Sequence, residues 1–189
     1  MPPRIGLPRA GESLLAPTPR STGDCRSGDW VERLDLGDRP DRIVVGTGPG
    51  SFAGIRSALA FAQGYAIGSG CEVLGLPSAC ALADASRKIA VVGDARRDKF
   101  WVALFDGFSQ RGDVFQVGRE GLFAAVPDDF TVVTPDAQRI DTLLTEVFGQ
   151  RYEGGRTPTA EGLKAFAEAN PSILKAEPLP IYLNPAVRD

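Results

Sequence analysis

The sequence contains no histidine among its 189 residues. Without an imidazole the chain can build no Ser-His-Asp triad, no Cys-His pair and no histidine-ligated metal site. What remains is carboxylate, lysine or cysteine chemistry, or no chemistry at all.

Cysteine is also scarce, with only Cys25, Cys71 and Cys80 present. No two of them form a C-x-x-C pair, and an odd number suits free thiols. We therefore interpret them as small buried residues in a reducing compartment rather than as a catalytic thiol.

An excess of positive charge is missing as well, because the formal net charge is -3. Binding to a nucleic-acid backbone requires clustered Lys and Arg. The composition therefore predicts no direct nucleic-acid binding, and any link to RNA would need a partner that supplies the positive surface.

The chain has no strongly apolar run of about 20 residues, which is what a membrane span requires. The longest low-charge stretch, 52–70, is rich in Gly and Ala and includes Arg56. The first residues also lack the apolar core of a signal peptide. We expect a cytoplasmic protein without a membrane segment.

From residue 42 onward the apolar pattern predicts alternating strands and helices. Strands are expected at 43–46 and 72–76, and helices at 52–69 and 78–87, the second capped by Ser78. Strand, helix, strand, helix at short spacing indicates parallel crossovers. The first 42 residues are weakly patterned, with short strands at 4–7 and 13–16, a loop at 17–28 and at most a helical turn at 30–36.

The second half begins with strands in succession, at 89–93, 100–105 and 114–117. A buried strand at 131–134 precedes a helix from about Asp136, and a further helix begins at Thr157 and Pro158. The tail 177–183 is extended because its prolines exclude helix. Since the two halves have a similar order of elements, we expect two lobes of one design, an N-terminal lobe of residues 1–88 and a C-terminal lobe of residues 89–189.

The segment 46–56, GTGPGSFAGIR, lies between a predicted strand and a predicted helix, where backbone N–H groups often bind anions. It is not a P-loop, because Ile55 and Arg56 stand where that motif has Lys followed by Ser or Thr. It does fit the dinucleotide-binding pattern at Gly48, Gly50 and Ala53.

Two residues weaken the dinucleotide interpretation. Glu72 lies about twenty residues downstream, as a ribose contact would require, but it opens its strand instead of closing it. Pro49 removes one N–H from the phosphate cradle. The remaining interpretation is a tight strand-to-helix turn that needs glycine, with Ser51 as the N-cap of the helix.

The helix at 52–69 has two apolar stripes and a single charge, Arg56. A surface helix normally has one such stripe. The second stripe therefore predicts either complete burial or contact with another protein. The candidate partner-binding residues are Phe52, Gly54, Ile55, Ala58, Leu59, Phe61, Ala62 and Tyr65, and the candidate loop motif is Gly48, Pro49, Gly50, Ser51 and Arg56.

Acidic residues near the segment 94–106 are the other candidates for chemistry. Asp94, Asp98 and Asp106 flank a predicted hairpin, and paired carboxylates there could bind Mg²⁺. We favour the simpler interpretation of turn residues and surface charge. Arg96 and Arg97 are likewise interpreted as solvated rather than as phosphate contacts.

Three segments resemble the TsaB family, the dimerization subunit of the tRNA threonylcarbamoyltransferase complex, also described as glycoprotease-like. They are the glycine segment 44–56, the segment 94–101 (DARRDKFW), which looks like the family's hairpin between its lobes, and 180–183 (PIYL), which looks like its terminal Pro-x-Tyr-Leu. The resemblance runs from about residue 43 to residue 183.

The resemblance implies an α/β chain with the actin-like ATPase fold, built from two ribonuclease-H-like lobes. It also implies no catalytic site and no cofactor in this chain. ATP and metal are expected on a related catalytic subunit, TsaD, which transfers the threonylcarbamoyl group to tRNA. A TsaE-type ATPase is a further implied partner, and the helix after the glycine loop is implied to form the homodimer or heterodimer interface.

The N-terminus departs from the family. Members usually open with an apolar strand that ends in Asp-Thr-Ser, whereas here 5–7 and 11–16 look like the second and third strands. We therefore expect an incomplete N-terminal lobe. The leading hypothesis is a non-catalytic scaffold subunit. The alternatives are a small nucleotide-binding enzyme that uses Gly48, Pro49 and Gly50, and a remnant that only self-associates.

Overall fold

The computed structural model describes residues 40–183. The segments expected at 4–7, 13–16, 17–28 and 30–36 lie outside this range. The strands are β1 (Arg42–Gly46), β2 (Glu72–Leu76), β3 (Lys88–Arg96), β4 (Lys99–Asp106), β5 (Ser109–Gln110), β6 (Phe115–Gly118), β7 (Thr131–Thr134), β8 (Tyr152–Gly155) and β9 (Lys175–Ala176). The α-helices are α1 (Phe52–Ser69), α2 (Ala137–Phe148) and α3 (Ala160–Ala169).

The described strands form two sheets. The first has the order β1-β2-β9, with β1 and β2 parallel and β9 antiparallel to β2. The second has the order β5-β4-β3-β7-β8, and β6 also pairs with β4. Within it β3 and β4 are antiparallel, whereas β3, β7 and β8 run parallel. This mixed sheet agrees with the ribonuclease-H-like lobe that the resemblance implies.

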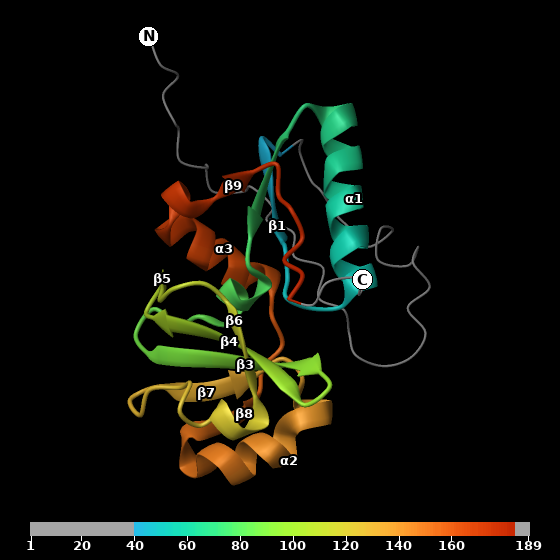
Figure 1. Cartoon of the computed structure of the whole chain (residues 1–189). Coiled ribbons are helices and arrows are strands. Elements are labelled where there is room, and N and C mark those ends of the chain that lie inside the picture. Colours follow the sequence, from blue (N-terminus) through green and yellow to red (C-terminus); the bar gives the residue numbers. More distant parts are fainter. Residues whose placement is uncertain (1–39, 184–189) are drawn as a thin grey trace.

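Alternation along each strand divides the core into layers, because successive side chains point to opposite faces. Ile43 and Val45 pack against α1, whereas Val44 between them joins the cluster that contains α3. In β3 the same alternation sends Ile89 and Val91 to that central cluster, and the intervening residues face α2. Figure 1 shows the resulting stack, with α1 and α3 on either side of the first sheet and α2 beyond the second.

The end of the chain returns to the first sheet. Helix α3 packs on the short 3₁₀ helix η2 (Ser78–Leu82), and a Cβ placed at Gly162 would lie 2.2 Å from the carbonyl oxygen of Ala81. Strand β9 then extends the first sheet beside β2. The two sheets therefore share one core through α3, while the division of the chain at residue 88 stays a prediction.

The helix predicted at 78–87 is wrong, because only η2 forms there. Ser78 does not cap it. Its Oγ instead accepts a hydrogen bond from the N–H of Gly48, at 2.9 Å. Past Leu82 the Asp84 carboxylate accepts hydrogen bonds from the N–H and hydroxyl of Ser86, which compete with helical bonding.

The start predicted for the last helix is also wrong. Thr159, rather than Thr157, is the N-cap of α3, and its Oγ1 accepts from the N–H of Gly162 at 3.0 Å. The face predicted for this helix is confirmed, since Leu163, Phe166 and Ala167 are buried. Strands β8 and β9 were not expected, because Tyr152–Gly155 is rich in glycine and Lys175–Ala176 is only two residues long.

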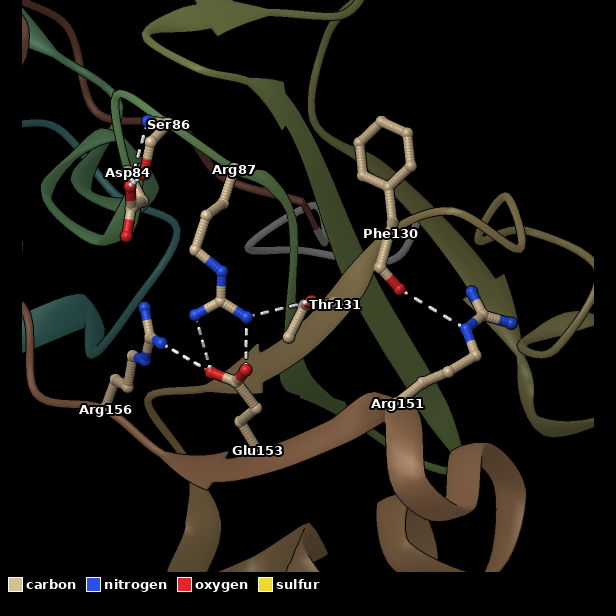
Figure 2. A network of polar contacts seen from close by, with 8 residues as sticks. All are labelled: Asp84, Ser86, Arg87, Phe130, Thr131, Arg151, Glu153 and Arg156. Atoms are coloured by element: carbon tan, nitrogen blue, oxygen red, sulfur yellow. Dashed lines mark hydrogen bonds and ion pairs between the residues drawn. The ribbon is translucent and has the colours of Figure 1, made fainter.

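A polar network joins the parallel strands of the second sheet near their N-terminal ends (Figure 2). The Arg87 guanidinium, just before β3, donates to both carboxylate oxygens of Glu153 on β8 and to Thr131 Oγ1 on β7. Arg156 donates to the same carboxylate at 2.6 Å. The hydrogen bond and charge from Arg87 lower the pKa of Glu153. This network connects β8, a short edge strand, to its neighbours.

Candidate functional site

The glycine loop connects β1 to α1, and its conformation depends on glycine. Gly48 has a φ of +103°, and a Cβ there would lie 2.7 Å from Ile55 Cδ1. Only glycine fits that combination of left-handed backbone and close contact. Ser51 is the N-cap of α1, as predicted, and its Oγ accepts from the N–H of Gly54 at 3.3 Å.

Two of the N–H donors of the loop are already engaged inside the protein. The Thr47 N–H donates to the Leu76 carbonyl at 2.8 Å, and the Gly48 N–H donates to Ser78 Oγ. Pro49 has no N–H to offer. The structure thus favours the tight-turn interpretation of the loop over the dinucleotide-binding one.

Helix α1 buries one face against the first sheet. Ile55, Ala58, Leu59 and Ala62 are at most 6% exposed and pack with Ile43, Val45 and Cys71. These four belong to the eight predicted partner-binding residues, and their side chains lie in the protein's own core. Of the other four, Phe52 and Gly54 are exposed, whereas Phe61 and Tyr65 are partly buried with stacked rings 6.3 Å apart.

The opposite side of α1 carries a stripe of exposed residues that the sequence pattern did not predict as a partner-binding face. Its residues recur at helical spacing, are all exposed and carry no charge. We call it the outward face of α1, and it consists of Ala53, Ser57, Ala60, Gly64 and Ile67. Ile67 is 88% exposed. A surface helix normally places charged residues there, so this face has the character of a protein interface. The signal was the absence of Asp, Glu and Lys from all 18 residues of the helix.

The tail motif lies against the glycine loop, although the two are far apart in the sequence. Ile181 donates its N–H to the Thr47 carbonyl at 2.8 Å. Tyr182 lies on Phe52 at the start of α1, with ring centroids 5.2 Å apart. Two of the three segments that carry the family resemblance are therefore in direct contact.

The third segment forms the hairpin between β3 and β4. Arg97 and Asp98, at its tip, have φ angles of 54° and 57°, and Arg96 before them has 68°. Positive φ at both central residues is what a two-residue type I′ turn requires, and it usually selects Asn-Gly. The Asp94 carboxylate accepts from the Arg96 N–H at 2.8 Å and supports this bend.

Two of the three carboxylates considered as Mg²⁺ ligands have other partners. Asp94 lies within salt-bridge distance of Arg96 and Arg139, and Asp106 pairs with Arg111. Within residues 40–183 no group of three or more His, Cys, Asp or Glu side chains is arranged to hold a metal ion. None of the helices in that range is long and apolar enough to cross a membrane.

Comparison with known proteins agrees with these observations. The family model of tRNA N6-adenosine threonylcarbamoyltransferase, TsaD, matches residues 33–122. YeaZ from Pseudomonas aeruginosa, a TsaB protein, superposes with a TM-score of 0.60 at 25% identity, over 76% of this chain and 74% of that one. This chain is TsaB-like. A search of curated protein sequences finds no significant match.

A second solved structure shares the fold. It is an uncharacterized protein with similarity to peptidase YEAZ, also from P. aeruginosa, with a TM-score of 0.59 and 24% identity over 77% of this chain and 74% of that one. The TsaB-like chain thus has the actin-like, ribonuclease-H-like fold of the TsaD family.

Proposed function

We propose that this TsaB-like chain is a non-catalytic scaffold subunit that binds a TsaD-type catalytic subunit through the outward face of α1. The observation that carries the proposal is that this face is exposed, uncharged and built mainly from small residues. An 18-residue helix is about 27 Å long, which is enough to anchor a standard interface of about 1,600 Å² in total.

The absence of histidine supports a role without catalysis, since the metal of the catalytic subunit is expected on histidines of that subunit. ATP is expected there too, so this chain needs no cofactor of its own. Its negative net charge favours a protein contact over a direct contact with tRNA. A TsaE-type ATPase would join the complex as a third component, and a homodimer through the same face is the competing assembly.

Nucleotide binding at Gly48, Pro49 and Gly50 is the alternative function, and the geometry does not favour it. The N–H groups of Thr47 and Gly48 are engaged, so a phosphate that used them would have to displace bonds that hold the loop to β2 and η2.

The proposal is tested by gel filtration with light scattering of this chain, alone and mixed with the TsaD-type subunit of the same organism. The expected result is a heterodimer for the wild-type chain. Ala60→Glu places a carboxylate on the outward face and is expected to abolish it. Thr142→Glu adds the same charge at an exposed position of α2 and serves as the matched control. A complex that survives Ala60→Glu would contradict the assignment of this face.

Ala58 and Ala62, two of the predicted partner-binding residues, are unsuitable as sites for Glu in this test. They are 6% and 2% exposed, so a buried carboxylate there would destabilise the chain itself. Loss of association in such a variant would therefore say nothing about an interface.

A further inference from the structure

The last described residues are fixed to β2 of the first sheet and to the glycine loop. Strand β9 pairs with β2, and Pro178 then packs so closely on Gly75 that a Cβ at residue 75 would lie 2.4 Å from the Pro178 Cβ. Three residues later the Ile181 N–H donates to Thr47. Figure 1 shows this red segment running back along the first sheet toward the start of α1.

These contacts place three side chains from two distant parts of the chain together. Phe52 lies 5.2 Å from the ring of Tyr182, and the guanidinium of Arg56 lies over the Phe52 ring at 4.4 Å from its centroid. Phe52 is 49% exposed and Tyr182 is 43% exposed. We call this group the aromatic ledge. Its rings are held by the fold while much of their surface faces outward, so a partner would pay little ordering entropy to bind them.

The ledge also has an uncompensated positive charge. Arg56 is the single charged residue of α1, and within residues 40–183 it forms no ion pair. The ledge continues into the outward face of α1, since Arg56 and the exposed Ala60 of that face are four residues apart on the helix. Tyr and Arg are enriched among the residues that dominate binding energy at interfaces. A partner surface that supplies a carboxylate to Arg56 and apolar contact to the two rings would be complementary to it.

We propose that the tail segment 178–182 is part of the surface that binds the catalytic subunit, with Phe52 and Tyr182 as aromatic anchors and Arg56 receiving a carboxylate of that subunit. The inference rests on the proposed function and extends its surface from one helix to a composite of α1 and the C-terminal tail.

The test is titration calorimetry of the full chain against the TsaD-type subunit, with Tyr182→Ala, Arg56→Gln and Phe115→Ala. Phe115 is a matched control, because it is a 37%-exposed ring on β6. Tyr182→Ala is expected to raise the Kd about tenfold or more. Arg56→Gln is expected to weaken binding and to reduce its dependence on salt, because the lost contact is ionic. Phe115→Ala is expected to bind like the wild type.

The outcomes separate this inference from the proposed function. If Tyr182→Ala and Arg56→Gln both bind like the wild type while Ala60→Glu does not bind, the ledge is not part of the interface and the scaffold proposal stands. If the wild-type chain itself does not bind, the proposed function fails and the inference fails with it. Melting curves of the variants check folding, and the exposure of both side chains predicts little change in Tm.

Discussion

Replacement of Gly64 separates the stability of this chain from its association. Gly64 lies in the interior of α1 on the outward face, and a Cβ built there meets no atom within 4 Å. Glycine in a helix interior is less favourable than alanine by about 0.5–1 kcal/mol. Gly64→Ala should therefore stabilise the isolated chain by that amount. For a chain of this size the Tm should rise by about 1–4 °C.

The effect on binding should have the opposite sign. If another protein packs closely on the outward face, the methyl group of Gly64→Ala weakens the complex, and Gly64→Glu puts an unpaired carboxylate into an apolar interface. We expect the Glu variant to lose about 100-fold or more in affinity while it stays at least as stable as the wild type. Thermal unfolding of the isolated chain and calorimetry with the catalytic subunit measure the two effects.

An unchanged affinity in both variants would refute the assignment of this face as the interface. A lower Tm would refute the placement of Gly64 on an open helix surface. Because Thr142→Glu adds the same charge elsewhere, it shows whether charge alone accounts for any loss of binding.

Three further predictions concern the rest of the chain. Asp98→Gly should raise the free energy of unfolding by about 1 kcal/mol, since glycine adopts positive φ without steric strain; a fall in a denaturant titration would contradict the turn geometry. Burial raises the pKa of the Cys80 thiol to about 12. Alkylation of the folded chain at pH 9, mapped by mass spectrometry, should therefore leave Cys80 unmodified until the chain unfolds. Rapid labelling of the native chain would contradict the burial of Cys80. Glu153→Gln should lower the urea midpoint more at pH 7 than at pH 3, because the pKa of Glu153 is lowered and its stabilising contribution decreases as the pH falls below the unfolded value toward the folded one. An equal effect at both pH values would contradict the ion pair with Arg87.

Much of the fold could be predicted from local sequence. Helix α1 occupies 52–69 as expected, because glycines bound it on both sides and Ser51 caps it. The long apolar strands were found because each alternates between two buried faces. The short helix η2 was mispredicted because Ser78, a good cap by type, is used by Gly48 from a distant loop.

The candidate site could be predicted only in part from the sequence. Two apolar stripes were predicted for α1. The outward face was not among them, because small residues such as Ala53, Ala60 and Gly64 give it little hydrophobic contrast. The contact between Tyr182 and Phe52 depends on the return of the tail to the first sheet. No local pattern encodes that pairing, since β9 is two residues long.

The most direct test of the scaffold proposal is a tRNA modification assay with the purified catalytic subunit, with and without this chain. The account predicts threonylcarbamoyladenosine when the wild-type chain is added, and little or none with Gly64→Glu or with the catalytic subunit alone. Equal modification in the presence and absence of this chain would contradict the account.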